Sequence, residues 1–423
     1  MEYVISGNDR GILREVAKRQ LEFSNMERNK ILKEKWYLHN ALQGDVPMVV
    51  LESWGFNNEV IVPRLKCEGE FARKVEFDIY QNFVNQELFE DDRVTPERFE
   101  MNYDTEFKLF DLDVQKEYVS GKQEEDSAGI GVRFIPVIED LEDDFEKIKR
   151  STFSVNMEST KIKFDLLTEI IGDILPVRIK MDALYSVPTQ MIIHLMDMEN
   201  MMINLAQYPE LFKKIMDQAA EDTLAYYDML EDKRLILPTT EYESVGQGTF
   251  AFNRELPDTP TADGRPLTRK DVWGYLDSQE TLSISPKMFE EIIFPCYEKI
   301  GSQFGLLSYG CCEPVHKIWD TCLSKFKNLR KVSISPWCDE EFMGERLQGT
   351  NIIYHRKPAA TFLGVGELLD EDAFRKYIRK SVFAAKGCKM EITQRDIYTI
   401  NNDVNKAHRY IEIIREEIEN NWK

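Results

Sequence analysis

The stretch Ser308-Tyr309-Gly310-Cys311-Cys312-Glu313-Pro314 follows directly on the short apolar run Phe304-Gly305-Leu306-Leu307. An apolar run of this length that ends in polar and reactive residues is typical of a buried strand and its carboxyl end. Three later segments, 332–338, 352–357 and 389–396, have the same layout. The repetition indicates a series of strands with reactive residues at their carboxyl ends.

Apolar runs alternate with longer stretches of helical character from residue 271 onward. Strands are expected at 272–276, 305–309, 331–335, 351–354 and 389–393, and helices at 286–304, 313–327, 339–347, 370–386 and 403–421. Strands joined by helices of this length form right-handed parallel units. We therefore predict a TIM-type (β/α)8 barrel over residues 46–423, with the site at the carboxyl ends of its strands.

The N-terminal part of the chain is less regular. Residues 1–45 are expected to form a helical arm, because apolar residues recur there at helical spacing. This arm would pack on a partner subunit. Residues 47–55 are expected to form a strand, and 56–175 to contain insertions that include an acidic loop at 123–127. Further strands are expected at 176–181 and 235–238. The long polar stretch between 238 and 272 is typical of a lid or binding loop.

Composition restricts the class of protein. The chain has 423 residues, 43% of them hydrophobic and 30% charged, which is typical of a folded globular protein. A net charge of −21 argues against nucleic acid or an anionic membrane as partner. The sequence has no apolar run near the roughly 20 residues that cross a bilayer, and no signal-peptide pattern at its start. These features predict a cytoplasmic protein with reduced cysteines.

Four of the seven cysteines, Cys311, Cys312, Cys338 and Cys388, stand at or beside predicted strand ends. Thiolates bind zinc, and a catalytic zinc takes three protein ligands and keeps one position open. The alternative is that free cysteines act as small buried apolar residues, which is favoured for Cys67, Cys296 and Cys322.

Carboxylates and amides form a second group of candidates. Asp277, Gln279 and Glu280 follow the predicted strand 272–276, and Glu313 and Glu391 would lie nearby in a closed barrel. Such carboxylates serve as general acids or bases, or as oxygen ligands of a metal. Asp277 is equally compatible with a helix N-cap.

The third group consists of residues that would hold a substrate. Arg356 follows a predicted strand directly and Arg395 follows another, and a guanidinium binds carboxylate or phosphate with two hydrogen bonds. Trp54, at the end of the strand predicted at 47–55, would line a pocket or pack at its rim. Of the histidines, His39 is expected on a helix surface, and His355 falls near the predicted site.

The stretch Ser285-Pro286-Lys287-Met288-Phe289-Glu290-Glu291-Ile292-Ile293-Phe294-Pro295, together with Tyr309–Pro314, Ser333–Trp337 and Arg356–Pro358, resembles the uroporphyrinogen decarboxylase superfamily. More narrowly, it resembles decarboxylase-like proteins found beside corrinoid methyltransferase systems. The similarity runs from about residue 185 to residue 423. The resemblance implies a TIM-type barrel, a dimer, and either decarboxylation or methyl transfer.

The two chemistries of this superfamily have different motifs. The decarboxylases carry an arginine-rich motif near the N-terminus, whereas the corresponding strand here has Glu52 and Trp54 and no arginine. The methyltransferases hold zinc by a His-x-Cys pattern and a second cysteine near the last strand. Laid on this chain, the pattern falls on Tyr309, Cys311 and Cys388, with tyrosine at the histidine position.

The leading hypothesis is a zinc-dependent methyltransferase that acts between a small molecule and a corrinoid protein. The resemblance implies that Cys311 and Cys388 bind zinc and that Cys312, Glu280, Glu391 or His355 completes the shell. Gln279, Tyr309 and Arg356 would orient the substrate. The alternative is a cofactor-free decarboxylase (a lyase), in which Arg356 or Arg395 holds the acid and Asp277 or Glu313 handles the proton. A third possibility is a non-enzymatic barrel that serves as a binding partner.

Overall fold

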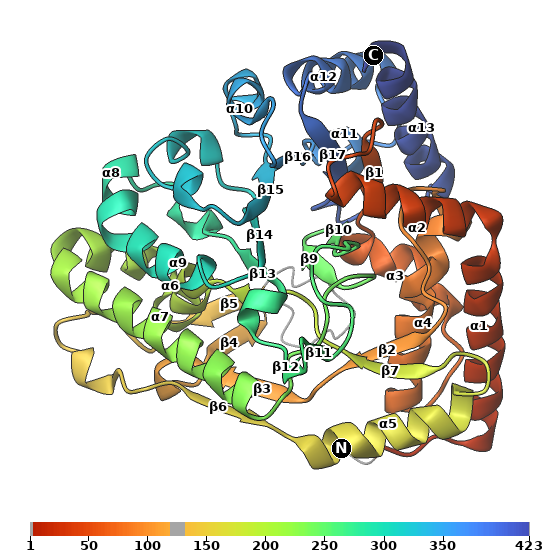
Figure 1. Ribbon diagram of the computed structural model, residues 1–423, viewed down its shortest axis with the longest axis horizontal. Coiled ribbons are helices and arrows are strands. Elements are labelled where there is room, and N and C mark those ends of the chain that lie inside the picture. Colours follow the sequence, from red (N-terminus) through yellow and green to blue (C-terminus); the bar gives the residue numbers. More distant parts are fainter. Residues whose placement is uncertain (1–2, 119–131, 423) are drawn as a thin grey trace.

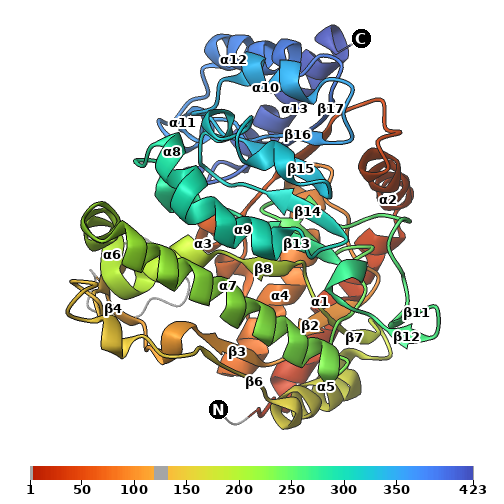
Figure 2. The ribbon, with the colours of Figure 1, turned by 60° about the vertical axis from the view of Figure 1, so that its left-hand side comes forward.

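The centre of the fold is a seven-stranded parallel sheet with the strand order β1-β17-β16-β15-β14-β13-β8 (Figures 1 and 2). The computed structural model describes residues 3–118 and 132–422, so the predicted acidic loop at 123–127 lies outside the described residues. The seven strands are β1 (Met48–Leu51), β8 (Leu184–Ser186), β13 (Trp273–Leu276), β14 (Leu306–Tyr309), β15 (Leu329–Ile334), β16 (Ile353–Arg356) and β17 (Lys389–Gln394). The five strands predicted beyond residue 271 are confirmed, with ends shifted by at most three residues.

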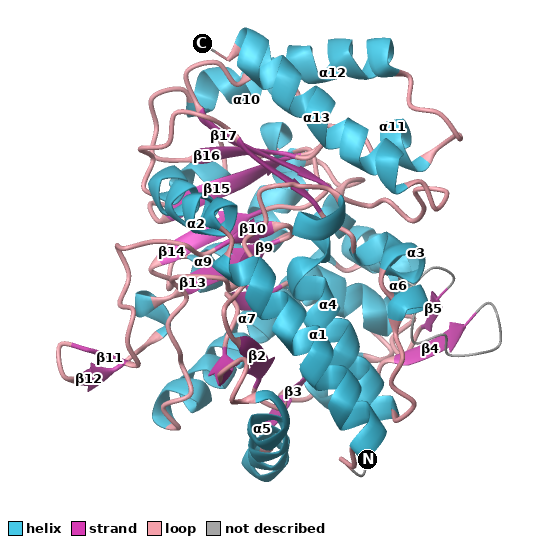
Figure 3. Ribbon diagram, turned by 90° about the vertical axis from the view of Figure 1, so that its right-hand side faces the viewer, coloured by secondary structure: helices cyan, strands magenta, loops and turns pink. Residues whose placement is uncertain are grey.

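Helices cover the outer face of this sheet in the C-terminal half of the chain (Figure 3). They are α9 (Phe294–Gly301), α10 (Glu340–Leu347), α12 (Glu371–Ala384) and α13 (Val404–Asn421). Asp339, Asp370 and Asp403 cap the last three by accepting the N–H of the residue three positions later. The helix predicted at 313–327 is irregular instead. Cys322 and Leu323 both donate to the Ile318 carbonyl, and only two short 3₁₀ turns form.

The described residues do not close an eight-stranded barrel, because β1 and β8 are the two free edges of the sheet. The edge of β1 is occupied by side chains: Asp92 accepts the Val49 N–H at 2.7 Å and Asp91 accepts the Leu51 N–H at 2.9 Å. The strand predicted at 176–181 forms β7 (Val177–Lys180), which pairs with β2 (Phe99–Asn102) outside the central sheet. Residues 235–238 form no strand.

A hairpin of β9 (Ser244–Gly246) and β10 (Thr249–Phe250) fills the inner side of the sheet. A Cβ atom on Gly246 would lie 3.1 Å from the Ser308 Oγ of β14, and one on Gly248 would lie 2.2 Å from the Thr393 Cγ2 of β17. Two strands stand between β14 and β17 in the sheet. The sheet therefore curls around the hairpin, and only glycine fits at Gly248, where φ is also +73°.

The N-terminal helices pack on their own chain. Met26 is extended and separates α1 (Gly7–Asn25) from α2 (Glu27–Asn40). Helix α1 packs along α4 (Glu70–Leu88), while α2 inserts Trp36, which is fully buried, beside Phe250 and Phe252. The surface position predicted for His39 is wrong: its ring is 2% exposed and faces the inside of the sheet.

The remaining elements surround the lower part of the molecule in Figure 1, apart from three short helices near the sheet. They are α3 (Asn57–Val60), β3 (Thr105–Lys108), β4 (Gln115–Tyr118), β5 (Val132–Ile135), β6 (Thr152–Val155), α5 (Met157–Ile171), α6 (Pro188–Gln207), α7 (Pro209–Asp232), β11 (Thr261–Ala262), β12 (Arg265–Pro266), α8 (Pro286–Met288) and α11 (Thr361–Gly364). No helix among the described residues is long and apolar enough to span a bilayer.

Candidate functional site

Polar side chains from four segments meet at the carboxyl edge of the sheet, around the sulfur of Cys311. The Arg395 Nη1 lies 2.8 Å from this sulfur, the Gln247 Oε1 2.8 Å and the Gln279 Oε1 3.2 Å. Lys357, which follows β16, donates to the Gln247 carbonyl at 3.1 Å. We call these five residues the mouth cluster. Parallel α/β folds bind ligands at this edge of the sheet.

Cys312 and two carboxylates extend the mouth cluster toward solvent. The Cys312 sulfur lies 3.4 Å from that of Cys311 and 3.5 Å from the Asp396 Oδ2. The guanidinium of Arg395 lies 3.3 Å from the Glu52 carboxylate and 3.2 Å from that of Asp396. The mouth cluster and Cys312 together therefore provide two thiols and two cations, with carboxylates on their outer side.

The groups around Cys311 have opposite effects on its pKa. The hydrogen bond with Cys312 and then burial raise the pKa of Cys311, while Arg395 and Lys357 lower it. Two thiolates at this separation repel each other, so the pair as a whole disfavours double ionisation. Burial, and then the charge of Arg395, lower the pKa of Lys357.

Asp277 follows β13 and is fully buried beside the mouth cluster. Its Oδ2 accepts a hydrogen bond from the Tyr275 hydroxyl at 2.8 Å, whereas its Oδ1 has no partner among the described residues. Burial raises the pKa of Asp277 to about 8, and Glu313 and Glu280 add to the effect. The Tyr185 ring, 52% exposed, stacks on Tyr275 at 5.0 Å. A buried carboxyl group with a raised pKa thus lies close to an aromatic surface.

Three residues predicted in the site instead have structural contacts. Glu313 accepts the N–H groups of Ser278 and Cys311, at 2.9 and 2.8 Å, and thereby joins the ends of β13 and β14. Tyr309 points away from the mouth into the core and bonds the Ser278 hydroxyl at 2.6 Å. Glu280 is 4% exposed and accepts from Thr189 of α6 at 2.8 Å.

Arg356, predicted to bind substrate, lies on the outer face of the sheet. It is fully buried and donates to the Glu340 carboxylate at 2.9 Å, the Ser381 hydroxyl at 2.9 Å and the Tyr377 hydroxyl at 2.6 Å. Side chains alternate along a strand, so Arg356 and the next residue, Lys357, face opposite sides. Lys357 is the cation that faces the mouth.

Glu391 lies inside the curled sheet and below the mouth. Its carboxylate is 3.0 Å from the Lys331 Nζ, 3.1 Å from the His39 Nε2 and 3.2 Å from the His355 Nδ1. Burial would raise the pKa of Glu391, but Lys331 and the two histidines hold it well below its usual range. Burial lowers the pKa of both histidines. The group is therefore a buried carboxylate held between Lys331 and two histidines.

The structure does not bring Cys388 to Cys311. Cys388 precedes β17 and so lies at the amino edge of the sheet, where its sulfur contacts the Gly344 carbonyl at 3.5 Å. Cys311 follows β14 and lies at the opposite edge. Across residues 3–118 and 132–422, no three His, Cys, Asp or Glu side chains are arranged to hold a metal ion. The predicted zinc ligands therefore do not fit a common ion.

Two residues of the mouth cluster were missed in the sequence, Gln247 and Lys357. Gln247 stands between Gly246 and Gly248, a pattern that indicates a tight turn. For the whole stretch 238–272 the sequence predicts only a lid or binding loop, which singles out no residue. Trp54 lies in the turn after β1 and is 56% exposed.

The fold and the site together define an α/β protein whose parallel sheet carries a buried thiol, two cations and a buried carboxyl with a raised pKa at its carboxyl edge. No family model matches the chain, and no curated protein matches it. The solved structure of a methyltransferase from Methanosarcina mazei is similar, with a TM-score of 0.49 and 12% identity over 93% of this chain and 99% of that chain. At this identity the likeness concerns the course of the chain alone.

Proposed function

We propose that this protein is a methyltransferase that removes a methyl group from a small molecule bound at the mouth cluster. The observation that carries the proposal is Asp277, a buried carboxyl with one oxygen that has no partner among the described residues and a pKa raised to about 8 by burial, close enough to Arg395 to feel its charge. A carboxyl kept protonated at neutral pH is suited to act as a general acid.

The methyl carbon is attacked by an acceptor carried on a partner, the bond between the methyl carbon and its heteroatom breaks, and the heteroatom takes the proton of Asp277. Arg395 and Lys357 hold an anionic part of the small molecule, and the exposed Tyr185 ring covers its apolar part. The sequence resemblance favours a corrinoid protein as that partner. The residues at the mouth do not fit zinc, so no step passes through a metal.

The same residues favour one second candidate, decarboxylation. Arg395 or Lys357 would hold the carboxylate, the bond to the carboxyl carbon would break with release of CO₂, and Asp277 would give its proton to the carbon that remains. Of the two arginines predicted to hold the acid, Arg395 lies at the mouth cluster, whereas Arg356 faces the helices.

One experiment separates the two candidates. The purified protein is incubated with free cob(I)alamin and a panel of methyl ethers, methylamines and methyl thioethers, and separately with aromatic and aliphatic carboxylic acids. Formation of methylcobalamin that falls about 100-fold in Asp277→Asn supports methyl transfer. Release of CO₂ without any methyl transfer would instead show that the protein is a decarboxylase.

A further inference from the structure

The β9–β10 hairpin carries Gln247, the one residue of the mouth cluster that does not follow a strand of the central sheet. The hairpin forms a separate two-stranded sheet, and no backbone ladder among the described residues joins it to the seven-stranded sheet. Side-chain contacts therefore have to fix its position. They form two sets, one where β9 begins and one at the turn between β9 and β10.

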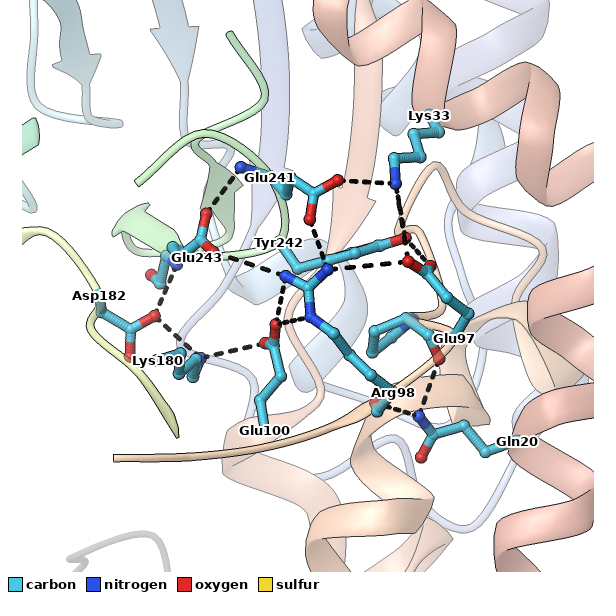
Figure 4. Close-up of polar contacts among 12 residues, drawn as sticks. Gln20, Lys33, Glu97, Arg98, Glu100, Lys180, Asp182, Glu241, Tyr242 and Glu243 are labelled. Carbon is cyan, nitrogen blue, oxygen red and sulfur yellow. Dashed lines mark hydrogen bonds and ion pairs between the residues drawn. The ribbon is translucent and has the colours of Figure 1, made fainter. Parts of the chain in front are cut away.

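The first set belongs to the charged network shown in Figure 4, which holds the hairpin where β9 begins. Glu241 pairs with Arg98 and with Lys33, whose Nζ donates to it at 3.0 Å. Asp182 accepts the Ser244 N–H at 2.8 Å. These contacts all lie before the turn, so they do not by themselves fix the residue that reaches the mouth cluster.

The second set consists of two buried side chains of the central sheet that hold the turn. The Lys331 Nζ of β15 donates to the Thr249 hydroxyl at 2.6 Å. The Thr393 hydroxyl of β17 donates to the Gly248 carbonyl at 3.0 Å. Gln247 directly precedes these two anchored residues. The two contacts therefore determine where Gln247 lies in the mouth cluster.

The buried carboxylate of Glu391 lies behind both contacts. The Thr393 hydroxyl has one hydrogen, which it gives to the Gly248 carbonyl, so toward His355 it can only accept. The His355 Nε2 therefore donates to this hydroxyl at 2.8 Å, while its Nδ1 lies 3.2 Å from the Glu391 carboxylate. The same carboxylate accepts from the Lys331 Nζ at 3.0 Å. Both side chains that hold the turn are thus linked to Glu391.

We propose that Glu391, Lys331 and His355 are positioning residues of the mouth cluster. They hold the turn of the hairpin from within the sheet, and His355 acts on Gln247 through the Thr393 hydroxyl. Apolar side chains of similar size would fill this interior without the desolvation cost of buried charges, but they could not bond the polar turn. The catalytic consequence rests on the function proposed for the mouth cluster, whereas the positioning of Gln247 does not.

The test removes one hydroxyl from the full chain. Thr393→Val keeps the size of the side chain and deletes the link between His355 and the Gly248 carbonyl. Amide hydrogen exchange in peptides that cover residues 244–250, followed by mass spectrometry, should become about tenfold faster. Labelling of Cys311 by N-ethylmaleimide should accelerate by a similar factor, because Gln247 then no longer covers this buried sulfur.

Three further variants separate positioning from a general loss of stability. Thr393→Ser keeps the hydroxyl and should return both rates to near the native values. Thr160→Val deletes a buried hydroxyl of α5 that accepts the Asp104 N–H at 3.0 Å, far from the mouth cluster, and should leave both rates unchanged. His355→Phe keeps a ring and removes the donor to Thr393, so it should accelerate both rates in the same direction as Thr393→Val.

The proposal is overturned if both rates in Thr393→Val and His355→Phe equal those of the native protein. It is equally overturned if Thr160→Val accelerates them as much, because the effect would then come from lost stability alone. Neither rate depends on catalysis. A protein that passes this test and transfers no methyl group would therefore disprove the proposed function and leave the positioning role in place.

Discussion

The Arg395 Nη1 of the segment after β17 lies 2.8 Å from the Cys311 sulfur of the segment after β14, across the curled carboxyl edge of the sheet. Two strands separate these segments in the sheet order, so the contact exists only because the sheet curls. A guanidinium at this distance stabilises a thiolate more than a thiol. Cys311 is therefore ionised more readily with Arg395 present than without it.

Replacing Arg395 should slow the alkylation of Cys311. Arg395 lowers the pKa of Cys311, so Arg395→Gln should raise it and reduce the thiolate fraction by about tenfold for each pKa unit. The rate of iodoacetamide labelling at Cys311, followed by peptide mass spectrometry at pH 8, measures this. Arg395→Lys keeps the positive charge and should restore most of the rate. Equal rates in the native protein and Arg395→Gln would contradict the assigned role.

The vicinal thiols of Cys311 and Cys312 should be captured together by a trivalent arsenical. Their sulfurs lie 3.4 Å apart, close enough for one arsenic atom to bond both. Phenylarsine oxide should give one adduct that a small dithiol reverses, and Cys312→Ser should abolish it. Cys338→Ser, at a separate buried cysteine, is the matched control and should leave the adduct in place. An adduct that persists in Cys312→Ser would show that the two sulfurs do not act together.

Asp277 should make stability fall as pH rises. Its folded pKa of about 8 exceeds the reference value of 3.8, so the folded state binds the proton more tightly. Between about pH 4 and pH 8 the unfolded state carries fewer protons at this group, and its contribution to stability is lost over that window. Between pH 5 and pH 8.5, the free energy of unfolding measured in urea melts should fall for the native protein. For Asp277→Asn it should fall less, by about 1 kcal/mol or more. Parallel pH profiles would refute the raised pKa.

Arg356 should matter for folding rather than for binding substrate. It is fully buried against the Glu340 carboxylate, and removing one partner of a buried pair costs about 3–5 kcal/mol. Arg356→Met should therefore lower the free energy of unfolding by that order. Arg346, paired with Asp320 at the surface, is the matched control, and Arg346→Met should cost about 1 kcal/mol or less. If Arg356→Met is as stable as Arg346→Met, then Arg356 does not have the structural role assigned to it.

The hairpin inside the sheet should tolerate no side chain at Gly248. A Cβ atom there would lie 2.2 Å from Thr393, and φ is +73°. Gly264 has φ of +79° and nothing within 4 Å of its Cβ position. Gly264→Ala should cost only the backbone term, about 1–2 kcal/mol, and Gly248→Ala about 1–3 kcal/mol more from overpacking. Thermal melts of the two variants measure the difference, and equal losses would mean that the hairpin is not packed into the sheet.

Much of the fold could be read from local pattern. The apolar runs that end at Tyr309, Ile334, Arg356 and Gln394 are buried on both faces, and such runs stand out in the sequence without any knowledge of their partners. The placement of Cys311 and Arg395 at strand ends also follows from the sequence. That the described residues supply no eighth strand to the sheet does not follow, because the edge of β1 is occupied by the carboxylates of Asp91 and Asp92 from a distant loop.

The sequence by itself determined which strands are parallel and buried and which reactive residues follow them, because these properties depend on the spacing of side chains along the chain. The tertiary structure alone decided which of these residues meet. It placed Cys388 at the opposite edge from Cys311, since one precedes its strand and the other follows. It also turned Arg356 outward and Lys357 inward, since a shift of one residue reverses the face of a strand. Gln247 contacts Cys311 because the sheet curls around the hairpin that carries Gln247. This contact joins residues far apart in the sequence, so no local pattern predicts it.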